Sequence, residues 1–212
     1  MNRDVAIILS WNEFLKYPAL YAEPGQIRFL YPDIKDRRLS DLLGNRAGVE
    51  VLSRRLLQDL DLDGGLTCPG DLDLATNRLA LLDQSSIWQV GMTAALTCYG
   101  DAVRSLFLKR QLAPIVKAIG ADNHRRAVRL VADGFDRDMP QRPRLDLDEW
   151  RNKAGELIAA WMGSLAAPIR KRVALKFPRA FGPALVVRTP QALRGFERLC
   201  NDMVDQCPAT GQ

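Results

Sequence analysis

The sequence predicts an all-α fold, and three observations support this prediction. Apolar residues recur at helical spacing from residue 39 onward, and no run of alternating β-branched residues is long enough to build a sheet. The 212 residues are 47% hydrophobic and 26% charged, a globular balance that excludes wholesale disorder. This length suits one domain, so we expect a single irregular helical domain around a long central helix. Its candidate lobes are 1–135 and 148–207, with a loop at 136–147 and a tail at 208–212.

The first helices expected along the chain are short and are bounded by glycines. Ser40 can cap a helix that ends before Gly44, and a second helix follows Gly48 with leucines at helical spacing. The run DLDGGLTCPGDLD comes next, and its glycines, proline and aspartates are typical of a solvated connector.

The longest helix is expected in the middle of the chain. Thr76 can cap a leucine-rich turn, after which Ser85 or Ser86 opens a helix that ends near Leu108. Two neighbouring apolar stripes run along this helix, so we expect it to be central and buried, with close packing at its small residues. The stripes are Ile87, Val90, Ala94, Cys98, Ala102 and Leu106, and Trp88, Met92, Ala95, Tyr99 and Val103.

Shorter helices are expected in the second half, each with its own start signal. The first spans 112–119 and ends at Gly120, with Pro114 tolerated in its first turn. Asp122 can cap the next helix, whose Ala127, Leu130 and Val131 face inward while its arginines can face out. The remaining starts are Asp148 as a cap, Pro168 in the first turn of 168–177, and Thr189 with Pro190 before a last helix.

Charge divides the chain into an acidic half and a basic half. Residues 1–103 hold 10 Lys and Arg against 14 Asp and Glu, whereas residues 104–212 hold 20 against 11, for a total of +5. Such an uneven charge distribution is compatible with binding to nucleic acid, with binding to an anionic membrane surface, or with docking between differently charged proteins.

The densest basic stretch is PIRKRVALKFPRAF, residues 168–181. One face can enter the core while the other is cationic, which suits a phosphate backbone, an anionic lipid surface or an acidic protein surface, although a plain solvated face explains the charges equally well. We predict that its cations bind a partner, with Arg170, Lys171 and Lys176 on the solvent face, and the arginines of the helix after Asp122 are the alternative site. The first set is Arg170, Lys171, Arg172, Lys176 and Arg179, and the second is Arg125, Arg126 and Arg129.

No catalytic, cofactor-binding or metal site is expected. Asp59, Asp61 and Asp63 match the start of an EF-hand loop, but Gly70 stands where the bidentate Glu is required. His124 is the only histidine and lies in a polar helix start, where solvent exposure is expected, and no phosphate-loop motif is present. The four cysteines form no CxxC pair, and the N-terminus lacks a signal-peptide pattern, so a cytoplasmic chain with reduced thiols is expected.

Two blocks of the sequence resemble the SctK/YscK family of type III secretion systems. The first, from Arg78 to Val131, contains the RLALL turn, the small-residue helix from Gly91 to Gly100 and the helix that ends at Gly120. The second, GELIAAWMGSLAAPIRKRVALKFP, has a Gly-led helix, a proline, a basic pair and an LKxP-like end. Within the family, the length and charge layout are most similar to the symbiotic branch, the NolU nodulation proteins of rhizobia.

This resemblance implies a non-enzymatic, all-helical cytoplasmic adaptor of the sorting platform, peripheral to the inner membrane. Its implied partners are the SctQ-type pod protein and the cytoplasmic domain of the SctD-type ring protein, with no specific nucleic acid and no membrane insertion. Two alternatives stay open: a basic helical nucleic-acid-binding regulator, and an adaptor that lies on a membrane surface.

Overall fold

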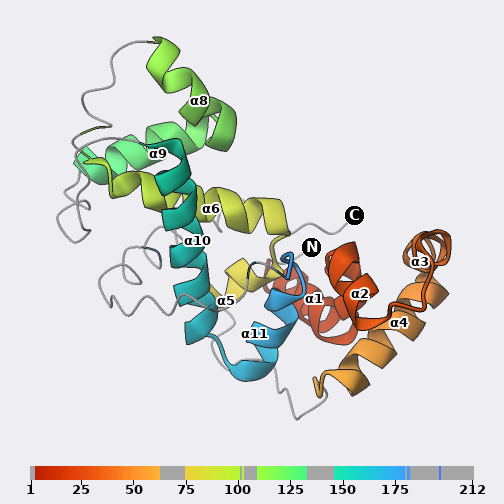
Figure 1. Cartoon of the computed structure of the whole chain (residues 1–212). Coiled ribbons are helices and arrows are strands. Elements are labelled where there is room, and N and C mark those ends of the chain that lie inside the picture. The colour runs from red at the N-terminus through yellow and green to blue at the C-terminus, as the bar shows by residue number, and fades with distance from the viewer. Residues whose placement is uncertain are drawn as a thin grey trace. The chain divides into compact units, whose positions relative to one another are not determined.

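The structure is a computed structural model, and it describes residues 3–62, 75–100, 102, 109–132, 146–179, 181 and 196. These residues form helices and contain no strand, which confirms the all-α prediction (Figure 1). The helices are α1 (Arg3–Lys16), η1 (Pro18–Leu20), α2 (Pro24–Leu30), α3 (Asp36–Leu43), α4 (Arg46–Asp59), α5 (Ala75–Arg78), η2 (Leu79–Leu81), α6 (Gln84–Thr97), α8 (Lys109–Ile119), α9 (Ala121–Ala132), α10 (Leu147–Ser164) and α11 (Ala167–Ala174).

The chain divides into two compact units. Unit 1 comprises residues 1–84, 164–182 and 207–212, and unit 2 comprises residues 85–163 and 183–206. The chain leaves unit 1 after residue 84 and returns to it with α11, a division that differs from the expected lobes at 1–135 and 148–207. Because α11 belongs with the N-terminal helices, contacts distant in sequence decide the composition of unit 1, and periodicity does not report such contacts.

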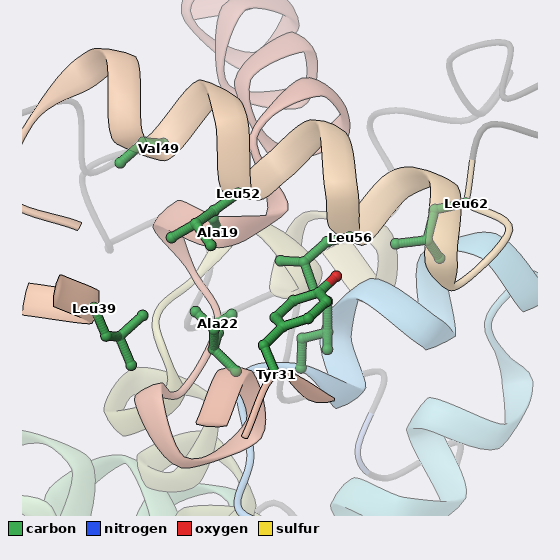
Figure 2. Close-up of a cluster of buried hydrophobic side chains, with 10 residues drawn as sticks. Ala19, Ala22, Tyr31, Leu39, Val49, Leu52, Leu56 and Leu62 are labelled. Carbon is green, nitrogen blue, oxygen red and sulfur yellow. The ribbon is translucent and has the colours of Figure 1, made fainter. Parts of the chain in front are cut away.

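Unit 1 has a hydrophobic cluster assembled from short helices (Figure 2). Leu52 and Leu56 of α4 lie against Ala19 and Ala22 and against the ring of Tyr31. Leu175, which follows α11, belongs to the same cluster. The C-terminal segment of unit 1 thus completes a core that the first 62 residues begin.

Helical structure begins at Arg3 and not near residue 39, so the sequence-based start was too late. Ile7, Trp11 and Phe14 occupy one face of α1 and are buried. Their spacing of four and three residues is helical, but Ile8 and Leu9 are apolar and exposed, so the helix has no clean polar face and its amphipathic pattern is weak.

The caps of α3 and α4 also differ from those expected. Ser40 lies inside α3, which begins at Asp36, whereas helix α4 is capped by Asn45, whose Oδ1 accepts from the N–H of Gly48 at 2.7 Å. Gly48 packs against the backbone of Leu42, where a Cβ would not fit. A glycine is therefore needed inside the first turn of α4 for close packing and not as a helix boundary.

Helix α6 is the buried helix of unit 2, as predicted. Ile87, Ala94, Ala95 and their neighbours on both stripes up to Ala102 are buried, apart from the half-buried Trp88. The helix ends at Thr97, earlier than the expected end near Leu108, and residues 103–108 lie outside the described part. Cys98 and Tyr99 donate to carbonyls three residues back, a tightening typical of a helix end.

Helices α6 and α10 cross at a glycine (Figure 1). A Cβ on Gly91 would lie 2.6 Å from Ile158 Cδ1 and 3.3 Å from the Ala154 carbonyl oxygen. The indole Nε1 of Trp150 donates to the Met92 carbonyl oxygen at 2.8 Å. This close approach confirms the prediction that small residues on α6 mark a packed surface.

Helices α8 and α9 are joined by one residue, Gly120. Its φ of 82° ends α8, as expected, and its carbonyl accepts from the N–H of His124 in the first turn of α9. Pro114 lies in the interior of α8, which begins at Lys109, and not in its first turn. The inward-facing residues of α9 were predicted correctly, since Ala127, Leu130 and Val131 are buried.

The cap of helix α10 lies two residues earlier than the cap predicted from sequence. Asp146 Oδ1 accepts from the N–H groups of Asp148 and Glu149, each at 2.9 Å, so Asp146 and not Asp148 is the cap. The loop predicted at 136–147 lies outside the described residues up to 145, and only Phe196 of the expected last helix is described, against Trp161.

Candidate functional site

Helix α11 and the turn after it carry the five cations predicted to bind a partner. Pro168 lies in the first turn, Ile169 and Val173 are buried, and the backbone turns back at Lys176. The structure separates the five cations into two groups. Arg170, Lys171 and Arg179 are exposed, whereas Arg172 and Lys176 are 4% and 1% exposed.

Lys176 is enclosed in unit 1. Its Nζ donates to the carbonyl oxygens of Ala80 and Leu82 at 2.7 and 2.6 Å, at the end of η2. The same atom lies 4.9 Å from the ring centroid of Phe14 and 4.7 Å from that of Tyr21. Burial lowers the pKa of Lys176 to about 7, while the carboxylate of Asp83 acts in the opposite direction.

Arg172 is enclosed in the same way. Its guanidinium donates to the Leu15 carbonyl in the last turn of α1 at 3.3 Å and to the Leu62 carbonyl just after α4 at 3.0 Å. It also donates to the Pro168 carbonyl within its own helix at 3.2 Å. The neighbouring Lys171 donates to the Leu60 carbonyl, the C-cap of α4, at 3.0 Å.

Lys171, Arg172 and Lys176 all donate hydrogen bonds to backbone carbonyls at helix ends in unit 1. The last carbonyls of a helix have no partner within it and carry partial negative charge, which a cation satisfies. Lys171, Arg172 and Lys176 supply donors where α1, α4 and η2 end. The prediction that Lys176 lies on the solvent face is therefore wrong, and Arg172, which was also predicted to bind a partner, is buried too; both residues hold unit 1 together.

Arg170 and Arg179 are two further exposed cations of this segment. The Arg179 guanidinium carbon lies 3.7 Å from the ring centroid of Phe29, a residue that is 51% exposed. Stacking on the ring fixes the guanidinium plane while its edge can still form hydrogen bonds. An exposed arginine oriented in this way can bind a carboxylate or a phosphate group.

The alternative set lies on α9 in unit 2. Arg125 and Arg129 are exposed, whereas Arg126 is half-buried and donates to Asn123 Oδ1 at 3.3 Å. Arg125 forms an ion pair with Asp122 in the first turn. The expectation that all three arginines face solvent therefore holds fully for two of them.

His124 is half-buried and not solvent-exposed as expected. Its Nε2 has no hydrogen-bond partner among the described residues, and burial lowers its pKa. Cys98 is buried and belongs to no disulfide among the described residues, which agrees with its predicted role in the core, while Cys200 and Cys207 lie outside the described residues. Within the described ranges, no three His, Cys, Asp or Glu side chains gather as metal ligands would. None of the described helices is long and apolar enough to cross a membrane.

The comparison with protein families decides the identity of the chain. Residues 9–209 match the family described as YOP proteins translocation protein K (YscK), a range that covers both units. The chain belongs to the YscK family. It is thus a type III secretion protein, and its family consists of accessory components of the secretion apparatus. Neither the curated proteins nor the solved structures contain a match.

Proposed function

We propose that this YscK-family protein is a non-enzymatic cytoplasmic adaptor that links the cytoplasmic domain of an SctD-type ring protein to an SctQ-type pod protein. The family match is the observation that carries this proposal, since it spans residues from both units. A chain with two compact units, each with exposed arginines, suits contact with two different partners. Assignment to the symbiotic NolU branch stays a prediction.

In unit 1, the surface that we assign to a partner consists of Arg170 and Arg179, the latter stacked on Phe29. Guanidinium groups bind carboxylates through two parallel hydrogen bonds, and an exposed aromatic ring adds apolar contact. The buried Arg172 and Lys176 are excluded from this surface, because they donate to carbonyls of unit 1.

The burial of these two cations also weighs against the nucleic-acid alternative for this segment. Affinity for a phosphate backbone grows with the number of phosphates that cations neutralise. With Arg172 and Lys176 enclosed, three of the five cations of the basic segment remain exposed, and one of them, Lys171, donates to a helix end.

A bridging assay tests the proposal. The ring protein's cytoplasmic domain is immobilised, and retention of the pod protein is measured with and without this chain. We expect retention only when the chain is present. We also expect R170E/R179E to lose one of the two partners, whereas R37E/R38E, an equal charge change at two exposed arginines of α3, keeps both. If wild-type protein binds neither partner, or only one, the adaptor function is refuted.

A further inference from the structure

Positive charge is most concentrated in unit 2 along the pair formed by α8 and α9. Residues 109–132 contain six Lys and Arg and a single acidic residue, Asp122. The basic residues are Lys109, Arg110, Lys117, Arg125, Arg126 and Arg129. Their excess of five charges equals the net charge of the whole chain, so the rest of the sequence is balanced.

Several of these cations are available on the surface, in contrast to those of the α11 segment. Lys117, Arg125 and Arg129 are exposed, and Val128, which lies between the two arginines in sequence, is 39% exposed. Arg125, Val128 and Arg129 share one face of α9, because residues three and four apart are neighbours on a helix. Lys117 and Arg129 form no ion pair with any acidic residue that the structure describes.

The joint between the helices gives this surface a defined geometry. Gly120 alone connects α8 to α9, and both neighbouring turns are hydrogen-bonded through its N–H and carbonyl. Ile115 and Ile119 of α8 and Ala127 of α9 are buried in the same unit. The exposed cations therefore stand on two packed helices, where less conformational entropy is lost on binding than in a loop.

From this placement we propose that the exposed face of α9, with Lys117 of α8, is a docking surface for an acidic protein. Residues 109–132 carry a single carboxylate, Asp122, which pairs with Arg125, so the exposed cations of this face are complementary in charge to an acidic protein surface. Apolar Val128 between two guanidinium groups suits a protein surface with both carboxylates and apolar side chains.

Other anionic partners fit this face less well. Single-stranded nucleic acid binds through aromatic rings on which bases stack, and residues 109–132 contain no Phe, Tyr or Trp. An interfacial membrane helix inserts bulky apolar residues such as Trp, Phe and Leu, whereas the exposed apolar residue on this face is Val128.

The inference deepens the proposed adaptor function, because it assigns a second contact surface to unit 2, and it is tested with two kinds of probe. The ring domain and the pod protein are the first, and poly-L-glutamate, which does not depend on the adaptor function, is the second. We expect R125E/R129E to bind poly-L-glutamate and one of the protein partners on the order of 100-fold more weakly at moderate salt. The control R37E/R38E, with the same charge change on α3, keeps wild-type affinity for both.

A variant with the opposite effect sharpens the test. Asp122→Asn removes the carboxylate that competes with the partner for Arg125. Because the partner no longer has to displace this exposed ion pair, its affinity for the protein should rise about two- to five-fold. Circular dichroism confirms that each variant stays helical.

The outcomes separate the two proposals. If wild-type protein binds neither protein partner but R125E/R129E loses poly-L-glutamate, the adaptor function fails and the acidic docking surface stands. Equal binding of R125E/R129E and wild type to poly-L-glutamate overturns the docking surface. It is also overturned if Arg125 and Arg129 are required only for duplex DNA or for vesicles with anionic lipids.

Discussion

Replacing Lys176 by Met should remove a pH dependence of stability that this buried amine creates. In the wild-type protein, burial lowers the pKa of Lys176 from 10.5 to about 7. Between these two values the unfolded chain binds a proton that the folded chain does not. The free energy of unfolding therefore rises with pH in this window and falls as the pH drops toward 7.

The expected magnitude follows from the two pKa values. Between pH 7 and pH 9, linkage raises the free energy of unfolding by on the order of 2 kcal/mol. The two carbonyls at 2.7 and 2.6 Å and the rings of Phe14 and Tyr21 favour the ammonium, so this figure is the upper end of the expected rise. The pKa of Tyr21 is raised to about 12 by burial and by Glu13, which places its titration outside the window.

The assay is urea unfolding of wild type and K176M, followed by circular dichroism at pH 7, 8 and 9. We expect the free energy of unfolding of the wild type to rise and that of K176M to stay level. At pH 9 the variant should also be less stable by roughly 2 kcal/mol, because the Ala80 and Leu82 carbonyls lose their donor. Arg170→Met, at an exposed cation of the preceding helix α11, is the control and should keep the wild-type slope. Parallel pH curves for wild type and K176M would refute the reasoning.

Two further predictions concern glycines. Gly91→Ala should destabilise unit 2 by about 1 to 3 kcal/mol, because the new Cβ would lie 2.6 Å from Ile158 Cδ1, and an unchanged melting temperature would contradict the close crossing of α6 and α10. Gly120→Ala should lower the free energy of unfolding by about 1 kcal/mol, because alanine rarely adopts a φ of 82°. Steric overlap adds nothing to this cost, since a Cβ at residue 120 meets no atom within 4 Å. The matched change Gly163→Ala lies inside α10, where a Cβ also meets no atom within 4 Å, and it should stabilise the protein by up to about 1 kcal/mol. If chemical denaturation shows that both alanine variants change stability in the same direction, the backbone argument is contradicted.

Local signals predicted the helices well where they are strong. Helix α6 was recognised as buried from its two apolar stripes, and Gly120 was recognised as the end of α8. Where signals were short they failed: α1 was missed, and the cap of α10 was placed on Asp148 although Asp146 holds the first N–H groups. Aspartates two residues apart are equivalent as caps in sequence, and the backbone geometry chooses between them.

At the candidate site, too, the sequence pattern and the tertiary contacts give different information. Lys176 and Arg172 continue the buried stripe of Ile169 and Val173, so helical spacing already placed them on the inner face. Their charge favoured the opposite interpretation, since lysine and arginine are rarely enclosed without partners. The partners that make burial tolerable are backbone carbonyls near residues 15, 62, 80 and 82, and any residue type supplies a carbonyl.

The sequence by itself determined that the chain is helical, that α6 lies inside, that charge is concentrated in the second half, and that two blocks resemble the YscK family. Each of these properties is local or summed along the chain. Only the tertiary structure decided that α11 joins the N-terminal unit and that Arg172 in this helix and Lys176 just after it donate to the ends of other helices. Such donors and acceptors are 94 to 157 residues apart, and only folding brings them within hydrogen-bonding distance.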